Sequence, residues 1–158
     1  MHDSYTSGPV ILDRPNIVAV KAAPVAGDVA RSRDHWLELA QSGERLVDYF
    51  SIYRRYETGN KLVGQIFLHD YDEVKHASLV GYHLFQPEFR GQGTGTIALR
   101  LLMQYVSTVT SIQCLSIITD QENHASQRVA EKCGFVYRGP AREGLPLIRY
   151  EWLRLPRK

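Results

Sequence analysis

The segment at residues 90–95 constrains this chain more strongly than any other part of the sequence. It reads Arg-Gly-Gln-Gly-Thr-Gly, so three alternating glycines fall within five residues. Glycine lets the backbone bend tightly and leaves neighbouring peptide N–H groups unshielded. Apolar residues then recur at helical spacing, at Ile97, Ala98, Leu101, Leu102, Tyr105 and Val106. The pattern predicts a turn that opens into a helix N-terminus, and such a place favours a phosphate or pyrophosphate.

Strand-like runs flank this turn and helix on both sides. Residues 77–85 precede the turn and residues 112–119 follow the helix, and both runs are rich in residues that favour strands. The order of strand, turn, helix and strand predicts a βαβ unit. Its two strands are expected to be parallel neighbours in one sheet.

The rest of the chain predicts further elements of ordinary length. Strands are expected over residues 17–20, 47–56, 61–69, 135–138 and 147–153, and helices over residues 28–40 and 123–133. Residues 1–9 read as a flexible N-terminal tail, and residues 10–158 as a single domain. The predicted fold class is α+β, with a mixed central sheet of six to seven strands flanked by helices.

Composition and charge exclude several classes of protein. A chain of 158 residues is long enough for one domain, and a formal charge of +2 is too small for a nucleic-acid-binding face. No apolar run reaches membrane-spanning length, and the first residues lack the pattern of a secretory signal. Cys114 and Cys133 are expected as free thiols in a reducing cytoplasm, and no histidine and cysteine cluster has metal-ligand spacing. We therefore expect a cytoplasmic protein without metal, nucleic-acid or membrane partners.

Two well-known phosphate-binding motifs do not fit the glycine turn. A P-loop needs GxxxxGK[ST], but counting from Gly91 places Thr96 where the second glycine belongs, and no lysine follows. The dinucleotide motif GxGxxG fits at Gly91 and Gly93 and fails again at Thr96. A turn without any ligand is a further alternative, although each glycine costs conformational entropy on folding.

A third motif does match. Arg90 to Gly95 reads R-x-x-G-x-G and resembles the [QR]-x-x-G-x-[GA] coenzyme-A motif of the GNAT superfamily of N-acyltransferases. Residues 80–84 and 87–93 also resemble the strand and turn that precede this helix in the family. Downstream, residues 123–126 and 131–135 resemble the N-x-x-S…K-x-G-F segment of the branch that acetylates protein N-termini, including those of ribosomal proteins.

The resemblance implies a GNAT-like fold and a set of cofactor-binding residues. In the family, the two central parallel strands splay apart, and acyl-CoA lies in the gap. The expected binding residues are Leu84, Phe85, Arg90, Gly91, Gln92, Gly93, Thr94, Gly95, Thr96, Asn123 and Ser126. Amides of the turn are expected to hold the pyrophosphate, and main-chain groups near Leu84 and Phe85 the pantetheine and the thioester carbonyl. The cosubstrate is acetyl-CoA, and no metal is implied.

Catalysis of this kind needs groups that handle protons, because an amine loses one proton and the departing thiolate gains one. His83 and His69 are the candidate bases, with His83 preferred, although either histidine could be purely structural. For the acid, Tyr137 and Tyr150 do not match the family position after the G-F segment. The resemblance offers Ser126 instead, near the thiol, while Asn123 and Ser126 could simply start a helix.

The sequence thus favours an acetyltransferase that moves an acetyl group from acetyl-CoA directly to a primary amine. The acceptor is a protein N-terminus or a small-molecule amine. A non-catalytic acyl-CoA-binding module or sensor is the main alternative, and a nucleotide-binding domain is a weaker one. Pairing into a homodimer is left open, with the last strands as an available edge.

Overall fold

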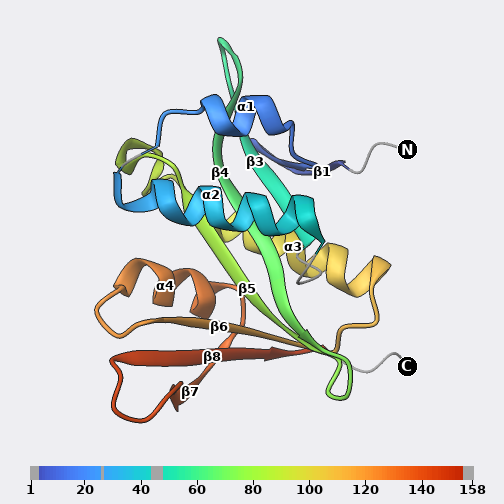
Figure 1. The fold of residues 1–158 in the computed structure, drawn as a ribbon, viewed down its shortest axis with the longest axis vertical. Helices are drawn as coiled ribbons and strands as arrows, with labels where there is room; N and C mark the ends of the chain where they lie inside the picture. Colours follow the sequence, from blue (N-terminus) through green and yellow to red (C-terminus); the bar gives the residue numbers. More distant parts are fainter. Residues whose placement is uncertain (1–3, 26, 44–47, 155–158) are drawn as a thin grey trace.

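The computed structural model describes residues 4–25, 27–43 and 48–154, which form a mixed sheet with helices on both faces (Figure 1). The strand order is β1-β2-β3-β4-β5-β6-β8-β7. The strands are β1 (Ser4–Ser7), β2 (Val10–Asp13), β3 (Asp48–Tyr56), β4 (Gly59–Asp72), β5 (Ala77–Leu84), β6 (Cys114–Asp120), β7 (Val136–Pro140) and β8 (Leu147–Leu153). The helices are α1 (Ile17–Ala22), α2 (Gly27–Ser42), α3 (Thr94–Val109) and α4 (His124–Lys132), with a short 3-10 helix at Pro87–Phe89.

The parallel pair predicted around the glycine turn is confirmed. β5 and β6 run parallel on either side of α3, whereas the other neighbouring strands in the described sheet are antiparallel. Their pairing extends only from Ala77↔Cys114 to Leu79↔Ser116. Beyond it β5 continues to Leu84 and β6 to Asp120, and the two strands diverge (Figure 1). The splayed central strands are therefore confirmed.

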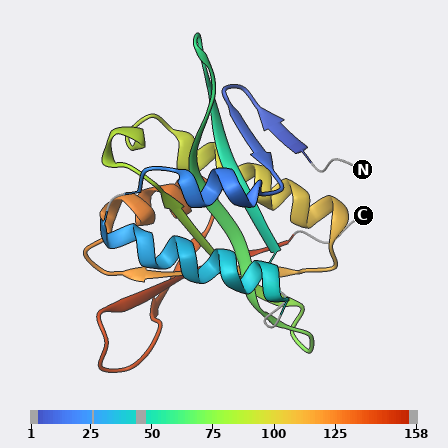
Figure 2. The same ribbon diagram turned by 45° about the horizontal axis from the view of Figure 1, so that its top comes forward.

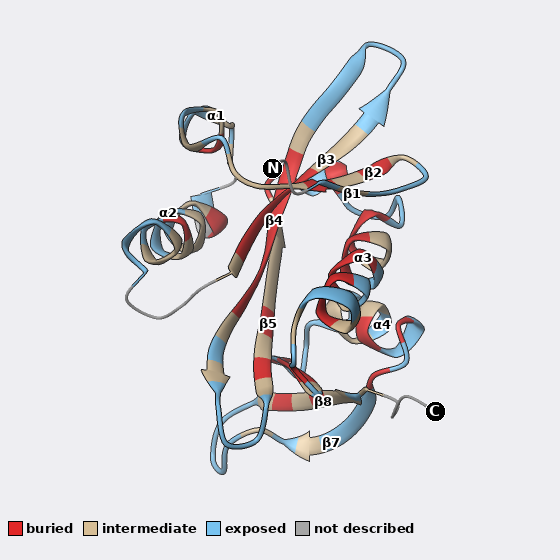
Figure 3. Cartoon of the chain, turned by 90° about the vertical axis from the view of Figure 1, so that its right-hand side faces the viewer, coloured by how far each residue is buried: buried red, intermediate tan, exposed pale blue. Residues whose placement is uncertain are grey.

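Two of the described α-helices cover each face of the sheet. α1 and α2 lie on one face, and α3 and α4 lie on the other (Figure 3). Most of the apolar stripe predicted on α3 is buried, with Ala98, Leu102 and Val106 0% exposed. Leu99, outside the predicted stripe, is also 0% exposed, and Ile97 is only partly buried. Burial of each large aliphatic side chain contributes roughly 1.5–3 kcal/mol, so this stripe fixes the helix against the sheet. Of the helices in the described ranges, not one has both the length and the apolar character needed to cross a membrane.

The predicted flexible tail over residues 1–9 is wrong for residues 4–7. These residues form β1, which pairs antiparallel with β2 from Ser4↔Asp13 to Ser7↔Val10. The Tyr5 ring packs edge-on against Phe50 and Tyr105, at centroid distances of 5.9 and 5.4 Å. Figure 2 shows this hairpin at the edge of the sheet beside β3. The hairpin raises the strand count to eight, above the predicted six to seven, because distant aromatic partners hold an otherwise polar segment.

The strand predicted at residues 17–20 is also wrong, because Ile17–Ala22 is the helix α1. Asn16 caps the helix, and its side chain accepts a hydrogen bond from the Ala19 amide at 3.1 Å. A short apolar run has no clear period, and here the capping residue in front of it decides for helix. The other predicted strands and helices are present with shifts of a few residues at their ends, and Val47 lies outside the described residues.

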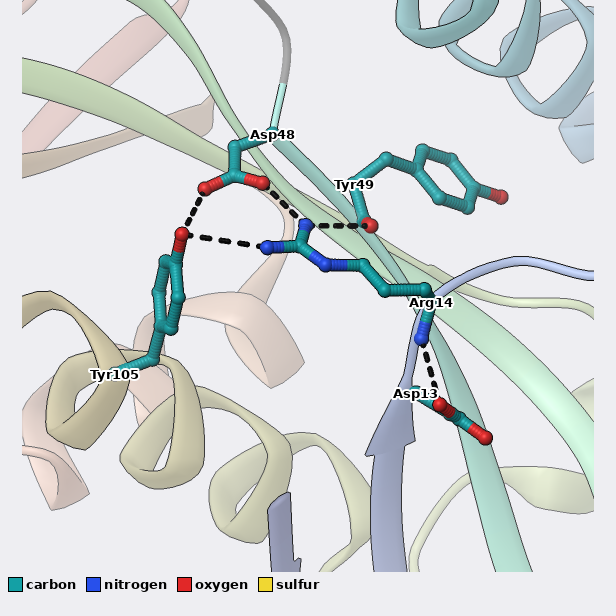
Figure 4. Close-up of polar contacts among 5 residues, drawn as sticks. All are labelled: Asp13, Arg14, Asp48, Tyr49 and Tyr105. Carbon is teal, nitrogen blue, oxygen red and sulfur yellow. Dashed lines mark hydrogen bonds and ion pairs between the residues drawn. The ribbon is translucent and has the colours of Figure 1, made fainter. Parts of the chain in front are cut away.

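A charged cluster joins the end of β2 to β3 and α3 (Figure 4). The Arg14 guanidinium forms an ion pair with Asp48 and lies 4.1 Å from the centre of the Phe50 ring. The Tyr105 hydroxyl donates to the second oxygen of the Asp48 carboxylate. Burial and the Asp48 carboxylate raise the pKa of Tyr105 to about 12, so its hydroxyl stays protonated and remains a donor. The cluster therefore ties α3, the helix that follows the glycine turn, to the end of β2 and to β3.

Candidate active site

The glycine turn ends in a helix N-terminus whose amides are open. Gly91 and Gly93 have φ angles of 74° and 78°, in the left-handed region that favours glycine, and Gly93 is the N-cap of α3. The first hydrogen bond of the helix runs from the Ile97 amide to the Gly93 carbonyl at 3.1 Å. The amides of Thr94, Gly95 and Thr96 therefore have no acceptor within the helix and are available to an anion.

These amides border a cleft of about 560 Å³ that is lined by the end of β5, the glycine turn and α4. The cleft is lined by Val29, Tyr82, His83, Leu84, Arg90, Gly91, Gly93, Thr94, Gly95, Thr96, Asn123, Ala125, Ser126, Arg128, Val129 and Lys132. Three of these residues are cations, Arg90, Arg128 and Lys132, and the described lining contains no carboxylate. Cations beside open helix amides give the cleft the character of a polyphosphate site.

The edge of β5 supplies main-chain groups to the same cleft. In an antiparallel ladder, successive residues direct their N–H and C=O groups alternately to opposite sides. The Phe85 amide donates to the Val63 carbonyl at 2.8 Å, on the side of β4. The alternation therefore turns the main-chain groups of Leu84 and Tyr82 toward the opened β6 side, which is the geometry needed to bind an extended amide chain.

Most of the predicted binding residues meet at this cleft, but Phe85 and Gln92 do not line it. The Phe85 amide is bound to Val63, and its side chain is 0% exposed in the core. The Gln92 side chain turns away, donating to the Glu88 carbonyl at 3.1 Å. The predicted residues that do line it are His83, Leu84, Arg90, Gly91, Gly93, Thr94, Gly95, Thr96, Asn123 and Ser126.

His83 lies at the end of a buried chain of hydrogen bonds. The Tyr49 hydroxyl donates to Gln65 Oε1 at 2.6 Å, and Gln65 Nε2 lies 3.1 Å from His83 Nδ1. Tyr49 and Gln65 are 3% and 0% exposed, so neither has water as an alternative partner. With the Gln65 amide oriented to accept from Tyr49, its nitrogen donates to Nδ1, and the proton of the neutral His83 ring sits on Nε2. In this arrangement the ring offers the cleft a donor, and a role as base would need the other tautomer.

The burial of His83 predicts a pH-dependent stability. Burial lowers the pKa of His83 below its ordinary value of 6.5, so the folded chain resists a proton that the unfolded chain accepts. As the pH falls through about 6.5, the free energy of unfolding should decrease, and it should level off below the folded pKa. Denaturant titrations of the wild type and His83→Gln between pH 8 and 5 measure this difference.

An exposed histidine provides the control for that measurement. The His124 side chain is 66% exposed at the start of α4. His124→Gln should follow the wild-type pH profile, whereas His83→Gln should lose part of the decrease. Identical profiles for the wild type and His83→Gln would contradict the burial argument.

Two further candidates from the sequence lie elsewhere. The His69 ring is tilted by 52° against Trp36, with 4.4 Å between ring centroids, and it lines a separate cavity near the end of α3. It is therefore not brought to the cleft. The Tyr150 hydroxyl donates to Glu131 at 2.8 Å, and Tyr137 is 54% exposed on the edge strand β7. Neither tyrosine is among the described residues that line the cleft.

A tyrosine that the sequence gave no reason to single out does line the cleft. The Tyr82 hydroxyl lies 3.4 Å from Ser126 Oγ and donates to it. Burial raises the pKa of Tyr82, so the hydroxyl keeps its proton at neutral pH. Asn123 caps α4 by accepting from the Ser126 amide at 3.1 Å, as the structural alternative predicted. Side chains alternate along a strand, so Tyr82 points to the face opposite that of His83. A search that follows only the face of His83 misses Tyr82, although both residues line the cleft.

A mixed sheet that opens between two parallel strands, with a glycine turn and open helix amides beside the opening, defines a class of split-sheet α+β folds. A profile of the acetyltransferase (GNAT) domain matches residues 15–136. The match covers most of the chain, and the chain belongs to this family.

Individual relatives agree with this family. YdaF of Bacillus subtilis, whose name gives ribosomal N-acetyltransferase as a provisional description, is 36% identical over 84 residues, which are 53% of this chain and 45% of that protein. The spermidine N(1)-acetyltransferase of Escherichia coli is 36% identical over 56 residues, which are 35% of this chain and 30% of that protein. The matched part thus spans less than half the length of either relative.

Solved structures share the fold over nearly the whole chain. The ribosomal L7/L12 alpha-N-protein acetyltransferase RimL, solved in complex with coenzyme A, has a TM-score of 0.72 and 19% identity. The similarity covers 96% of this chain and 98% of that one. At this identity the comparison establishes the fold alone.

Proposed function

We infer that this chain transfers an acetyl group from acetyl-CoA directly to a primary amine. One observation carries the inference: the open amides at the start of α3 and the free edge of β5 border the same cleft. A diphosphate at the first and a pantetheine chain along the second would place the thioester in the gap between β5 and β6. Membership of the acetyltransferase (GNAT) family supports this assignment.

The cofactor-side roles follow from the positions of the lining residues. The turn from Gly91 to Thr96 and the Arg90 side chain bind the diphosphate, and Arg128 and Lys132 add positive charge from α4. The Leu84 main chain binds the pantetheine and polarises the thioester carbonyl. Fixed N–H dipoles of this kind stabilise the charge that develops on a carbonyl oxygen and commonly supply a large part of catalysis.

Proton transfer is assigned to a different set of residues. The amine nitrogen forms a bond to the carbonyl carbon, the carbon–sulfur bond breaks, and the thiolate takes a proton. Ser126, hydrogen-bonded to a protonated Tyr82, is the donor on the thiol side. His83 presents its Nε2–H to the cleft. Because its Nδ1 lone pair is held by Gln65, water takes the proton that the amine loses.

The pKa of the amine favours a protein N-terminus as the acceptor. An α-amino group has a pKa near 8, so roughly a tenth of it is neutral at pH 7, whereas an alkyl amine near 10 is almost entirely protonated. Since no proton-accepting side chain is assigned in the described cleft, the amine with the lower pKa, which is already partly neutral, is the better acceptor. Small-molecule amines remain the second acceptor class, in keeping with the spermidine acetyltransferase among the relatives.

A free-thiol assay tests both the reaction and the acceptor. The wild type is incubated with acetyl-CoA and, in turn, with peptides of different first residue, spermidine and an aminoglycoside. Thiol release with one or more peptides, exceeding that with spermidine, is the expected result. Binding of acetyl-CoA without turnover on any amine would instead identify a non-catalytic sensor. The cytoplasmic location and the homodimer remain predictions.

A further inference from the structure

The hairpin that joins β3 and β4 projects from the rest of the fold (Figures 1 and 2). Its side chains contact the glycine turn. Pairing between β3 and β4 continues to Tyr56↔Gly59, whereas β5 joins β4 only from Gly64. The tip therefore projects beyond the body of the sheet. Several of its side chains nevertheless have defined partners, and these partners lie in residues 89–94.

Arg54 makes the principal contact between this hairpin and the turn. Its Nη1 donates to Thr94 Oγ1 at 2.9 Å and to the Gln92 carbonyl at 3.3 Å. The two acceptors stand on either side of Gly93, the left-handed N-cap of α3. Thr94 is 1% exposed, so its hydroxyl is held inside the protein. A single guanidinium thus braces the turn across the residue where the chain reverses into the helix.

Two weaker contacts hold the same region. The Tyr56 hydroxyl donates to Gln92 Oε1 at 3.4 Å. The Lys61 ammonium lies 5.0 Å from the centre of the Phe89 ring, which is buried directly before the turn. Contacts from both strands of the hairpin therefore converge on residues 89–94.

We propose that Arg54 is a positioning residue for the diphosphate-binding turn, a role that rests on the function proposed above. Bracing the turn before the ligand arrives reduces the conformational entropy that binding costs. The buried Thr94 hydroxyl accepts from Arg54, and Thr94 lines the cleft, so the contact fixes the residue at the start of the open amides.

The chain contains a matched control for this proposal. Arg55 is the next residue of β3, it is exposed, and successive strand residues point to opposite faces. Arg54→Gln and Arg55→Gln therefore remove the same charge from neighbouring positions, and only the first removes the contacts with the turn. Arg54→Lys keeps the charge and a donor at the braced position.

Calorimetric titration of CoA and 3′-dephospho-CoA measures the effect, since neither titration depends on the acceptor. Arg54→Gln should weaken both ligands by about tenfold, the loss of one charge-assisted hydrogen bond, and Arg55→Gln by less than about twofold. Arg54→Lys should recover part of the loss. In a cycle with Thr94→Val, the double variant should lose less than the product of the two single losses, because Arg54 acts through that hydroxyl.

Three results would overturn the proposal. Equal losses in Arg54→Gln and Arg55→Gln would indicate a general effect of charge. A loss seen with CoA and absent with 3′-dephospho-CoA would indicate a direct contact with the 3′-phosphate. No loss in Arg54→Gln would show that the turn needs no brace. The wild-type titration separates the two proposals. Wild-type binding with no loss in Arg54→Gln overturns the role of Arg54 alone, whereas a wild type that binds neither ligand overturns the proposed function on which that role rests.

Discussion

Replacement of Gly93 by valine should weaken CoA binding by at least about 100-fold, or about 2.7 kcal/mol, while the protein remains folded. Gly93 has a φ angle of 78°, which a β-branched residue avoids. A Cβ added at Gly93 meets no atom beyond its chain neighbours within 4 Å, and Gly93 lines the cleft. The variant therefore shifts the turn amides and occupies the room for the diphosphate. Loss of two charge-assisted hydrogen bonds, each worth roughly 1.5–3 kcal/mol, accounts for the magnitude.

Gly144 offers a control that separates backbone strain from loss of the site. Its φ angle is 79°, its added Cβ also meets nothing within 4 Å, and it lies in the loop between β7 and β8. Gly144→Val should cost about the same 1–2 kcal/mol of left-handed strain and leave CoA binding unchanged. Calorimetry and denaturant unfolding of both variants give the comparison. Normal CoA binding by Gly93→Val would refute the anion-binding turn.

The largest loss of stability is expected from Gly64→Ala. A Cβ at Gly64 would lie 2.4 Å from the His83 carbonyl oxygen and 3.1 Å from the Leu84 side chain. A backbone oxygen in a strand ladder cannot rotate away, so β4 and β5 must separate. Overpacking usually costs about 1–3 kcal/mol, and this contact with backbone places the change at about 3 kcal/mol or above. Denaturant unfolding at constant pH measures the free energy of unfolding.

Gly27→Ala is the matched control, because a Cβ at Gly27 meets nothing within 4 Å at the start of α2. Its free energy of unfolding should stay within about 0.5 kcal/mol of the wild type. Since Gly64 pairs with Leu84, which borders the cleft, Gly64→Ala should also weaken CoA binding in whatever fraction remains folded. Equal stability of the two variants would contradict the close approach of the strands.

Local sequence determines those features that depend on backbone conformation and on residue spacing within a few positions. The alternating glycines from Gly91 to Gly95 require a turn, and the apolar spacing after Gly95 requires a helix with one buried face. Together with the strands on either side, these features predicted the parallel pair and its ligand. The Asn123 cap followed from residue type in the same way, and its hydrogen bond to the Ser126 amide is confirmed.

Failures of sequence reasoning have a common cause in contacts between distant positions. Residues 4–7 are polar and look like a tail, and they become a strand because Tyr5 finds Phe50 and Tyr105. Phe85 and Leu84 are both apolar and adjacent, and only the ladder with β4 decides which main chain faces the cleft. Periodicity cannot report such a choice, because it depends on the partner strand and not on the residue.

The sequence by itself determined the glycine turn, the helix that follows it and the family to which the chain belongs, because glycine conformation, helical periodicity and a short motif are local properties. Only the tertiary structure decided what surrounds the turn. Arg54 is 38 residues from Gln92 and 40 from Thr94, and Gln65 is 18 residues from His83. These pairs meet because strand pairing and sheet twist bring distant side chains together. Neither effect can be predicted from the identity of the residues that come into contact.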